Sequence, residues 1–349
     1  MRIELLYSGG TFGMVDQGAG LRPRSGIGGE IADIVARFEA DEERSVEVRY
    51  AELEDVIDSS DADPATACRI AEHVRSSVES APLDGVIVIH GTDTMAYVGA
   101  RLAFELREIT VPLVLTGAQI PLGHPGSDAP SNLRLALNSI AAEPGPGTFL
   151  AFGSGRHPAV RASKRAGDDF EAFVAIREFT PPPTPPDLRI RGLGNAVRRP
   201  VGLVTVFPGM HAAFLDVATH HYSGGIVLEC YGSGTLPLQG CATIETVRQA
   251  TLRGTPVVVI TQCDSGSVDL GRYLPGRAML DAGAISGGDM TRESALAKLA
   301  YLVDLGLSGP PLRHWMSVNL LGELSNPPAA PAFFAPVDDQ DTHPIHRSR

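Results

Sequence analysis

The sequence predicts an α/β fold with two domains, and three observations support that prediction. Short apolar runs alternate with helical patterns along the first half of the chain. Strands separated by helices are typical of a parallel sheet. A proline-rich stretch at 180–186 interrupts the alternation, because proline fits neither a helix interior nor a central strand. At 349 residues the chain is also too long for one small domain, so a second α/β unit is expected.

The first half of the chain contains the clearest elements. We expect strands at 3–7, 46–52, 86–89, 111–115 and 148–152, and helices at 65–80, 95–106 and 129–142. The run at 111–115 is apolar nearly throughout, as in a strand buried on both faces. Residues 12–30 hold six glycines and little periodicity, so we expect a long loop there. It is either a mobile lid or a plain surface connection.

The second half repeats the alternation of strands and helices. We expect strands at 201–207, 225–228 and 256–261, and helices near 213–220, 241–253 and 292–305. The predicted domains are residues 1–185 and 201–326, joined by a linker at 186–200. The proline-rich and acidic tail at 327–349 is expected to be disordered.

Composition and charge exclude several classes of function. The formal net charge is −12, whereas a nucleic-acid partner requires a basic face. No apolar run is long enough to span a membrane. Cys68, Cys230, Cys241 and Cys263 are widely spaced, which favours free thiols in a reducing compartment and offers no zinc site. We therefore expect a cytoplasmic protein without a metal, a cofactor, a nucleic-acid partner or a membrane partner.

Two threonines follow predicted strands, at the edge where a parallel sheet binds its ligands. Thr11 ends the segment LLYSGGT, and Thr92 lies in HGTDT, which directly follows an apolar run. Loops at the carboxyl ends of parallel strands are free to carry chemistry. Two hydroxyls, with the carboxylate of Asp93, favour attack on a small polar substrate. Each segment alone fits an ordinary turn equally well, with Thr or Asp as a helix cap and Gly at the bend.

Lysine is scarce in this chain. Of 29 basic residues only Lys164 and Lys298 are lysines. Lysine, unlike arginine, can lose its proton and act as a base. Lys164 lies in a polar segment that is expected to be a loop, and it is a candidate base. Lys298 lies within the helix predicted at 292–305, where we expect a solvated face.

Signatures of other chemistries are missing from the sequence. It has no G-x-S-x-G elbow, no Walker A loop and no H-E-x-x-H zinc motif. The glycines near Thr11 lack the G-x-G-x-x-G spacing of a dinucleotide site.

The remaining motifs resemble those of bacterial asparaginases, in the same order, and the chain most resembles the cytoplasmic type I branch. Those of the first half are YSGGTFGM at 7–14, DSSD at 58–61, HGTDTMAY at 90–97, LTGAQIP at 115–121 and Lys164. Those of the second half are PGM at 208–210, YGSG at 231–234, TQC at 261–263 and GGDMT at 287–291. The resemblance covers residues 1–325. It implies a larger N-terminal parallel-sheet domain of the flavodoxin-like type and a smaller C-terminal α/β domain.

The resemblance also implies catalytic roles. Thr11 matches the family's nucleophile, whereas Thr92, Asp93 and Lys164 match a relay in which neutral Lys164 accepts a proton from Thr92 or from an oriented water. The implied reaction converts L-asparagine and water to L-aspartate and ammonia in a homodimer or homotetramer. Whether Thr11 or water attacks first stays open.

Substrate contacts are implied for a second set of residues, namely Asp58, Ser59, Ser60, Gly91 and Ala118. Ser59 and the backbone after it match a clamp for the α-carboxylate, and Asp93 pairs with the α-amino group. Backbone amides near Thr92 and Ala118 match an oxyanion hole.

Three positions depart from the family pattern. Leu21 stands where the family's lid carries a tyrosine that accepts the nucleophile's proton, which leucine cannot do. Either another group activates Thr11, or the lid docks differently, or the protein is weak on asparagine. Thr235 replaces a common asparagine that reaches a neighbouring subunit's site. Near the position of Glu229 the type I branch often has an arginine that is linked to asparagine binding at a regulatory site. Glu229 reverses that charge, so no such regulation is expected.

Three hypotheses about function therefore stand. The first is hydrolysis of L-asparagine. The second keeps the chemistry but takes another amide, such as glutamine, a D-amide or a larger molecule. The third is an asparagine-binding protein with little catalysis, which Leu21 favours and Lys164 disfavours.

Overall fold

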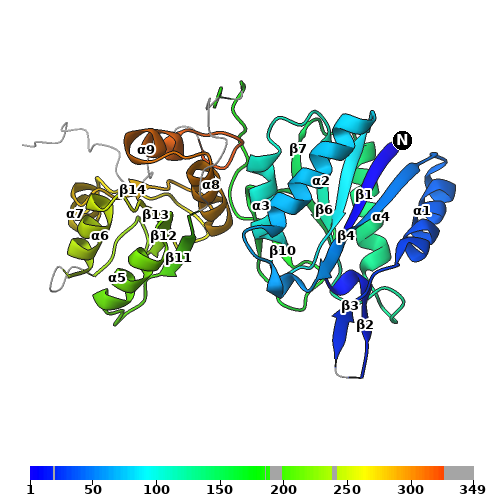
Figure 1. The fold of residues 1–349 in the computed structure, drawn as a ribbon, viewed down its shortest axis with the longest axis horizontal. Coiled ribbons are helices and arrows are strands. Elements are labelled where there is room, and N and C mark those ends of the chain that lie inside the picture. Colours follow the sequence, from blue (N-terminus) through cyan, green and yellow to red (C-terminus); the bar gives the residue numbers. More distant parts are fainter. Residues whose placement is uncertain (19, 185, 189–198, 238–241, 326–349) are drawn as a thin grey trace, which may run out of the picture.

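The computed structural model describes residues 1–325 except 19, 185, 189–198 and 238–241. It contains a larger N-terminal and a smaller C-terminal α/β domain, side by side (Figure 1). Residues 189–198 of the predicted linker, the whole predicted tail at 327–349, and Cys241 lie outside the described residues. None of the described helices combines the length and the apolar character needed to cross a bilayer.

The N-terminal domain is built on one six-stranded sheet with the strand order β4-β1-β5-β6-β7-β8. Its strands are β1 (Arg2–Gly9), β4 (Glu47–Ile57), β5 (Gly85–Ile89), β6 (Pro112–Thr116), β7 (Gly147–Phe152) and β8 (Gly155–Pro158). All are parallel except β8, which pairs antiparallel with β7. The parallel strands follow the 2-1-3-4-5 order of flavodoxin-like folds. The strand order reverses at β1, so the crevice between the carboxyl ends of β1 and β5 is the expected ligand site.

Helices cover both faces of this sheet (Figure 1). Helices α2 (Thr66–Ser80) and α3 (Met95–Glu105) pack on one face, and α1 (Gly28–Glu42) and α4 (Ala129–Ala141) pack on the other. Side chains of a strand alternate between the faces. Leu6 therefore lies in the core with α2 and α3, whereas Tyr7 lies in the core with α1 and α4.

The prediction of one long loop at 12–30 is wrong. Strands β2 (Met14–Asp16) and β3 (Leu21–Pro23) form an antiparallel hairpin, which projects from the lower edge of the domain in Figure 1. Gly18 and Gly20, near its tip, have φ values of 85° and 111°, which glycine adopts without strain. Helix α1 begins at Gly28, within the same range, and the sequence prediction missed it.

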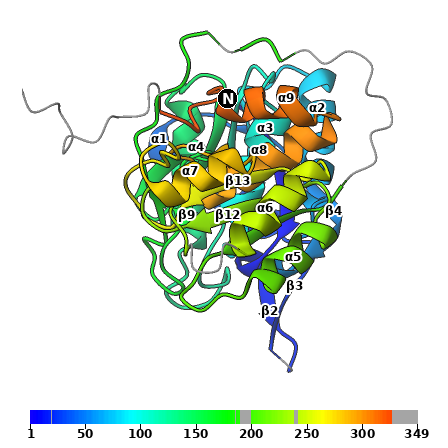
Figure 2. The ribbon, with the colours of Figure 1, turned by 90° about the vertical axis from the view of Figure 1, so that its left-hand side faces the viewer.

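The C-terminal domain has a parallel four-stranded sheet of its own. Its strands, in order, are β11 (Val201–Thr205), β12 (Gly225–Cys230), β13 (Val257–Thr261) and β14 (Ile285–Ser286). One face is covered by α5 (Ala212–His221), α6 (Ala242–Leu252) and α7 (Leu274–Asp281), which lie toward the viewer in Figure 2. The other face is covered by α8 (Arg292–Asp304) and α9 (Gly309–Ser317). Strand β14 and helices α7 and α9 were not predicted.

The two domains share a core where α3 meets α8. The rings of Phe104 and Tyr301 stack with their centroids 5.9 Å apart. Arg101 pairs with Asp304 at 2.6 Å beside them. The position of α8 is therefore tied to the helix that directly follows the Thr92 segment.

The prediction that Lys298 lies on a solvated face is wrong. Its side chain is fully buried, and Nζ donates to Oε1 of Glu323 and to the carbonyl of Val318, both at 2.6 Å. Helix α8 packs on the C-terminal sheet, on α3 and on α9, so it is buried nearly all round. A buried ammonium needs a charged partner, which Glu323 provides.

Candidate active site

Two close approaches, each at a glycine, bring the predicted site segments together at the end of the sheet. A Cβ atom on Gly10 would lie 2.2 Å from Cα of Gly91, and one on Gly91 would lie 2.3 Å from Oγ of Ser59. Gly10 also has a φ of 83°, which disfavours a side chain. The segments carrying Thr11, Ser59 and Thr92 meet because both positions are glycine.

Helix capping does not account for the two threonines. Thr11 begins a single 3₁₀ turn, η1 (Thr11–Gly13), whose capping position is Gly10. Helix α3 is capped at Thr94, two residues after Thr92. Thr11 is half-buried at the carboxyl end of β1, and Thr92 is 5% exposed.

The structure brings Lys164 to Thr92 and Asp93. Its Nζ donates to Oγ1 of Thr92 and to Oδ1 of Asp93, both at 2.8 Å. A catalytic base must lie about 2.6–3.2 Å from the group whose proton it takes, so Lys164 is within reach of Thr92. Lys164 ends β9 (Ala162–Lys164), which pairs antiparallel with β10 (Phe173–Ala175). The prediction of a loop there is wrong, because two strands of three residues each are too short for their periodicity to be visible in the sequence.

Residues that the sequence prediction missed hold the loop after β6. Gln119 accepts from Oγ1 of Thr92 at 3.3 Å, and its own amide donates to the carbonyl of Asp169 at 3.0 Å. The carboxylate of Asp128 accepts from the backbone of Gln119 at 2.9 and 3.0 Å. Ala118, predicted to help form the oxyanion hole, is fully buried in the same loop. Gln119 lies within a motif quoted above, but its contact with Thr92 could not be deduced from the motif alone.

The predicted clamp residues form a second 3₁₀ turn, η2 (Ser59–Asp61). Asp58 caps it by accepting from the backbone N–H of Ser60 at 3.0 Å. Ser59 is 3% exposed and faces Gly91, whereas Ser60 is exposed. Asp58 thus shapes the turn, and Ser59 lies toward the Thr92 segment.

The C-terminal domain anchors the strand that carries Lys164. Oγ of Ser163 donates to Oε1 of Glu293 at 2.8 Å, and the fully buried Arg161 pairs with the carboxylate of Asp289 at 3.2 Å. Burial raises the pKa of Glu293, whose Oε2 has no hydrogen-bond partner among the described residues. None of these partners was predicted, since their contacts join residues more than a hundred positions apart.

Leu21 lies on the hairpin rather than at the site. It pairs with Asp16 across β2 and β3, and it is 44% exposed. Two phenols lie near the segments on either side of the hairpin, Tyr7 against Gly13 and Tyr50 against Gly28. Burial raises the pKa of both Tyr7 and Tyr50, and the Tyr50 hydroxyl donates to the carboxylate of Glu52. A raised pKa makes the phenolate harder to form, so neither group is predisposed to accept a proton from Thr11.

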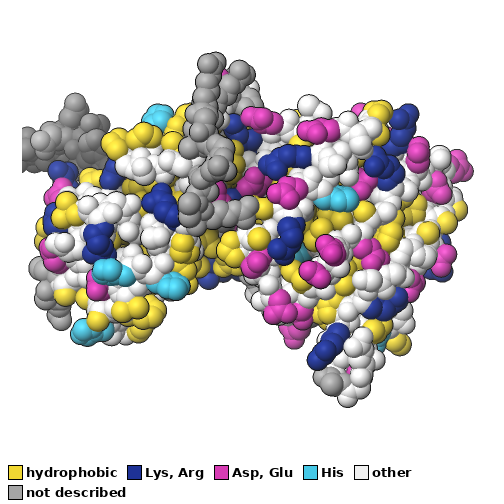
Figure 3. Space-filling view, in the orientation of Figure 1, with side chains coloured by type: hydrophobic (Ala, Val, Ile, Leu, Met, Phe, Trp, Pro, Cys, Tyr) yellow, Lys and Arg dark blue, Asp and Glu magenta, His cyan; other side chains and the backbone are white. Residues whose placement is uncertain are grey.

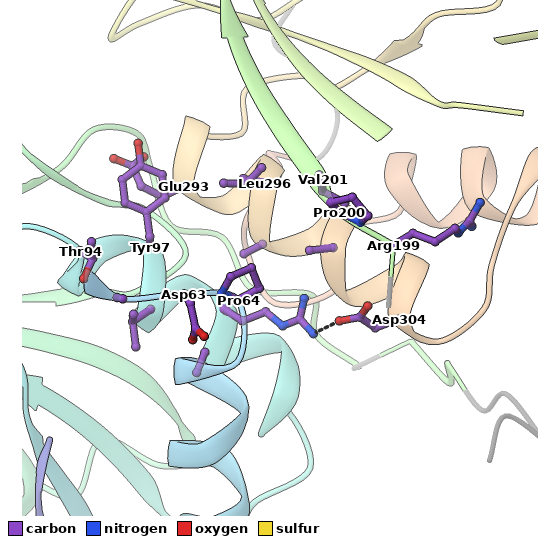
Figure 4. Close-up of a pocket in the computed structure, with 16 residues that line it drawn as sticks. Asp63, Pro64, Thr94, Tyr97, Arg199, Pro200, Val201, Glu293, Leu296 and Asp304 are labelled. Atoms are coloured by element: carbon purple, nitrogen blue, oxygen red, sulfur yellow. Dashed lines mark hydrogen bonds and ion pairs between the residues drawn. The ribbon is translucent and has the colours of Figure 1, made fainter. Parts of the chain in front are cut away.

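A cavity of about 470 Å³ opens between the domains beside this site (Figure 4). Thr94 and Tyr97 line it from the N-terminal domain, and Glu293 and Leu296 line it from the C-terminal domain. Its walls are mainly apolar, and the ion pair of Asp304 with Arg101 lies at the end away from Thr94 (Figure 4).

Charge on the molecular surface is mixed. On the face drawn in Figure 3, acidic and basic side chains are interspersed over the N-terminal domain. That face has no continuous basic band to which a polyanion could bind, which agrees with the net charge of −12.

Comparison with known proteins identifies the family. The model of the family "Asparaginase, N-terminal" matches residues 2–181, and that of the "Glutaminase/Asparaginase C-terminal domain" matches residues 200–316. L-asparaginase 1 of Escherichia coli K12 is 34% identical over 340 residues, which cover 93% of this chain and 98% of that protein. One subunit of the glutamyl-tRNA(Gln) amidotransferase of Aeropyrum pernix is 32% identical over 79% of this chain and 70% of its own length.

A solved structure shows the same fold. The thermostable L-asparaginase from Thermococcus kodakarensis superimposes with a TM-score of 0.77 at 30% identity, over 93% of this chain and 99% of that one. The family models match in order along both domains, and the two L-asparaginases each align over 93% of the chain. The chain therefore belongs to the asparaginase family and is an asparaginase-type amidohydrolase.

Proposed function

We propose that this protein hydrolyses L-asparagine to L-aspartate and ammonia. The observation that carries the proposal is the position of Lys164, whose Nζ lies 2.8 Å from both Thr92 Oγ1 and Asp93 Oδ1. Similarity to L-asparaginase 1 of Escherichia coli supports the choice of substrate.

In the proposed mechanism Lys164 acts as the base. In its neutral form it accepts a proton from the Thr92 hydroxyl or from an oriented water. The attacking oxygen, from Thr11 or from water, bonds to the side-chain carbonyl carbon of asparagine. The attacking hydroxyl gives up its proton to Lys164, directly or through Thr92, and Lys164 returns that proton to the leaving nitrogen, which departs as ammonia when the carbon–nitrogen bond breaks. Attack by Thr11 produces an aspartyl ester that water hydrolyses, whereas attack by water produces aspartate directly.

The substrate's ionic groups and its developing oxyanion are held by separate parts of the site. Ser59 and the backbone of η2 bind the α-carboxylate. Asp93 is 64% exposed, so its carboxylate can take the α-ammonium group while Oδ1 accepts from Lys164. Backbone N–H groups near Thr92 and Ala118 donate to the oxyanion, and one such donor typically lowers the barrier by about 3–4 kcal/mol.

The hairpin of β2 and β3 is the proposed lid. It follows Thr11 directly in the chain and stands away from the body of the domain (Figure 1). Closure over the substrate would exclude water from the site. Because Leu21 supplies no proton acceptor, activation of the nucleophile falls to Lys164 and Thr92 in this proposal.

Self-association is also proposed. Phe214 and Val217 on α5 and Leu252 on α6 are 56%, 68% and 74% exposed, which supports an interface between copies of this chain. Light scattering coupled to size-exclusion chromatography tests for the homodimer or homotetramer that the family resemblance implies. We place the activity in the cytoplasm, as the type I resemblance implies.

Ammonia release from L-asparagine, D-asparagine and L-glutamine, measured side by side, tests the function. The proposal predicts release that is fastest from L-asparagine. Faster release from another amide would favour the second candidate, an amidase with a different substrate, which Leu21 motivates. Calorimetric binding of L-asparagine without ammonia release would favour the third candidate, a binding protein.

A further inference from the structure

His90 is a fully buried side chain at the centre of the site, and the reaction proposed above gives it no role. It directly follows β5 and precedes the Gly91–Thr92 segment. Its Nδ1 lies 2.8 Å from Oγ of Ser8, and its Nε2 lies 3.1 Å from Oγ1 of Thr94. The imidazole therefore connects the end of β1 to Thr94, the capping residue of α3.

Both neighbours of His90 continue the chain of contacts. Oγ of Ser8 lies 2.9 Å from the carbonyl oxygen of Ile89, and Oγ1 of Thr94 lies 2.9 Å from the carbonyl oxygen of Ser59. Four contacts thus run from Ile89 through Ser8, His90 and Thr94 to Ser59. One end lies in the sheet, and the other end is the proposed α-carboxylate clamp.

The four contacts share too few hydrogens. Each hydroxyl has one hydrogen, and a neutral imidazole has one N–H. Desolvation lowers the pKa of His90 to about 4, so its imidazole is neutral near pH 7. Three hydrogens cannot serve four contacts, and the tautomer of His90 decides whether the shortage falls on the Thr94 side or on the Ser8 side.

The two tautomers send the hydrogens in opposite directions. With the hydrogen on Nδ1, His90 donates to Ser8 and Ser8 donates to Ile89, so the one hydrogen of Thr94 must serve either Nε2 or the carbonyl of Ser59 and cannot serve both. With the hydrogen on Nε2, His90 donates to Thr94 and Thr94 donates to Ser59, so the one hydrogen of Ser8 must serve either Nδ1 or the carbonyl of Ile89.

The surroundings favour the Nε2–H tautomer. Ile89 is paired with Tyr7 on one side and Thr116 on the other, so its position does not depend on Ser8. Ser59 lies in a 3₁₀ turn of three residues, which has few hydrogen bonds of its own. A hydrogen bond from Thr94 therefore matters more for the position of Ser59 than a bond from Ser8 does for the position of Ile89. Thr94 occupies the capping position of α3 but makes no side-chain cap bond, because its hydroxyl faces Ser59 and His90 instead.

We propose that His90 is a positioning residue whose neutral Nε2–H tautomer holds the Ser59 clamp in place through Thr94. The proposal deepens the proposed function and rests on it, because the clamp has a substrate to hold only if the site binds asparagine. His90 does not touch the substrate in this account. Its effect is therefore expected in KM more than in kcat.

Two matched substitutions separate the two ends of the imidazole. The amide nitrogen of His90→Gln approximates Nε2 and can still donate to Thr94, whereas that of His90→Asn approximates Nδ1 and reaches Ser8 alone. The KM for L-asparagine is expected to be at least about tenfold higher in His90→Asn than in His90→Gln, with kcat values within about threefold of each other. Equal KM values in the two variants would overturn the role of His90.

Nuclear magnetic resonance of ¹⁵N-histidine-labelled protein shows which ring nitrogen of His90 carries the hydrogen, and this measurement does not depend on catalytic activity. The chain has ten histidines, so the signals lost in His90→Gln identify those of His90. We expect a protonated Nε2 and an unprotonated Nδ1 at every pH between about 5.5 and 8.5. A protonated Nδ1, or a titration within that range, would overturn the proposal. The expected tautomer in a protein that releases no ammonia would instead count against the proposed function alone.

Discussion

Nζ of Lys164 lies 2.8 Å from Oγ1 of Thr92, although 72 positions separate the two residues in the chain. Thr92 is brought there by β5, and Lys164 by β9, whose neighbours Arg161 and Ser163 are held by the C-terminal domain. The contact therefore depends on both domains. Lys164 belongs to the N-terminal half of the chain, but its position relative to Thr92 is held by contacts from the C-terminal half.

Replacing Gly10 is expected to destabilise the protein, because Gly10 lies so close to Gly91. Gly10→Ala would place Cβ 2.2 Å from Cα of Gly91, a contact that only a backbone shift relieves. Gly18→Ala is the matched control, since Gly18 has a φ of 85° against 83° for Gly10 but no atom within 4 Å of its Cβ position. We expect a loss of about 1 kcal/mol for the control and at least about 2 kcal/mol more for Gly10→Ala. Urea unfolding measures both, and equal losses would contradict the packing account.

Burial of neutral His90 makes stability dependent on acid pH. Its pKa is about 4 in the folded protein against an ordinary value of 6.5, so the unfolded chain binds a proton that the folded one refuses. This contribution to stability is fully present above pH 6.5 and is lost as the pH falls toward 4. The loss amounts to about 3 kcal/mol. The free energy of unfolding is measured at pH 7.5 and at pH 4.5 for the unaltered protein and for His90→Gln. The decrease from pH 7.5 to pH 4.5 should be smaller in His90→Gln, and equal decreases would contradict this burial effect.

Removing one partner of the buried pair of Lys298 and Glu323 is expected to destabilise the fold. Lys298→Met leaves the Glu323 carboxylate without its counter-charge, which costs about 3–5 kcal/mol. The double variant Lys298→Met with Glu323→Gln removes both charges and should recover most of that loss. Thermal unfolding of the single and double variants provides the measurement. A double variant no more stable than Lys298→Met would show that the charge is not the cause.

A hydroxyl restored at position 21 tests the lid. Leu21 is 44% exposed, so an aromatic ring fits there without disturbing the core. If the hairpin closes over Thr11, Leu21→Tyr supplies a proton acceptor and is expected to raise kcat for L-asparagine at least about tenfold. Leu21→Phe adds the ring without the hydroxyl and should leave kcat near its starting value. The same kcat in both variants would mean that position 21 does not reach the nucleophile.

Much of the N-terminal sheet could be predicted because its strands are continuous apolar runs. The run at 86–89 lies within β5, the run at 111–115 overlaps β6 with an offset of one residue, and the helix predicted at 95–106 corresponds to α3. Helix α1 was missed although Ile31, Ile34, Val35 and Phe38 have helical spacing, because the glycine-rich stretch before it favoured a loop. Local pattern identifies an element, but a glycine run obscures where that element begins.

The partners within the site could not be predicted from local pattern. The family resemblance anticipated that Thr92, Asp93 and Lys164 would act together, and the structure brings them into contact. Gln119 and Glu293 were missed because their contacts arise only when the loops at one sheet edge and the C-terminal domain come together. The burial of Lys298 was missed for a related reason. Helical periodicity shows which face is polar, but not whether another helix covers that face.

Ammonia release from L-asparagine by Lys164→Met and Lys164→Arg tests the central claim most directly. Methionine removes the base, and arginine keeps a positive charge that cannot be lost near neutral pH. Circular dichroism confirms that each variant is folded. We predict that both variants lose at least about a hundredfold in kcat, with Lys164→Arg no better than Lys164→Met. Retention of activity within about threefold by Lys164→Arg would contradict the claim that Lys164 acts by accepting a proton.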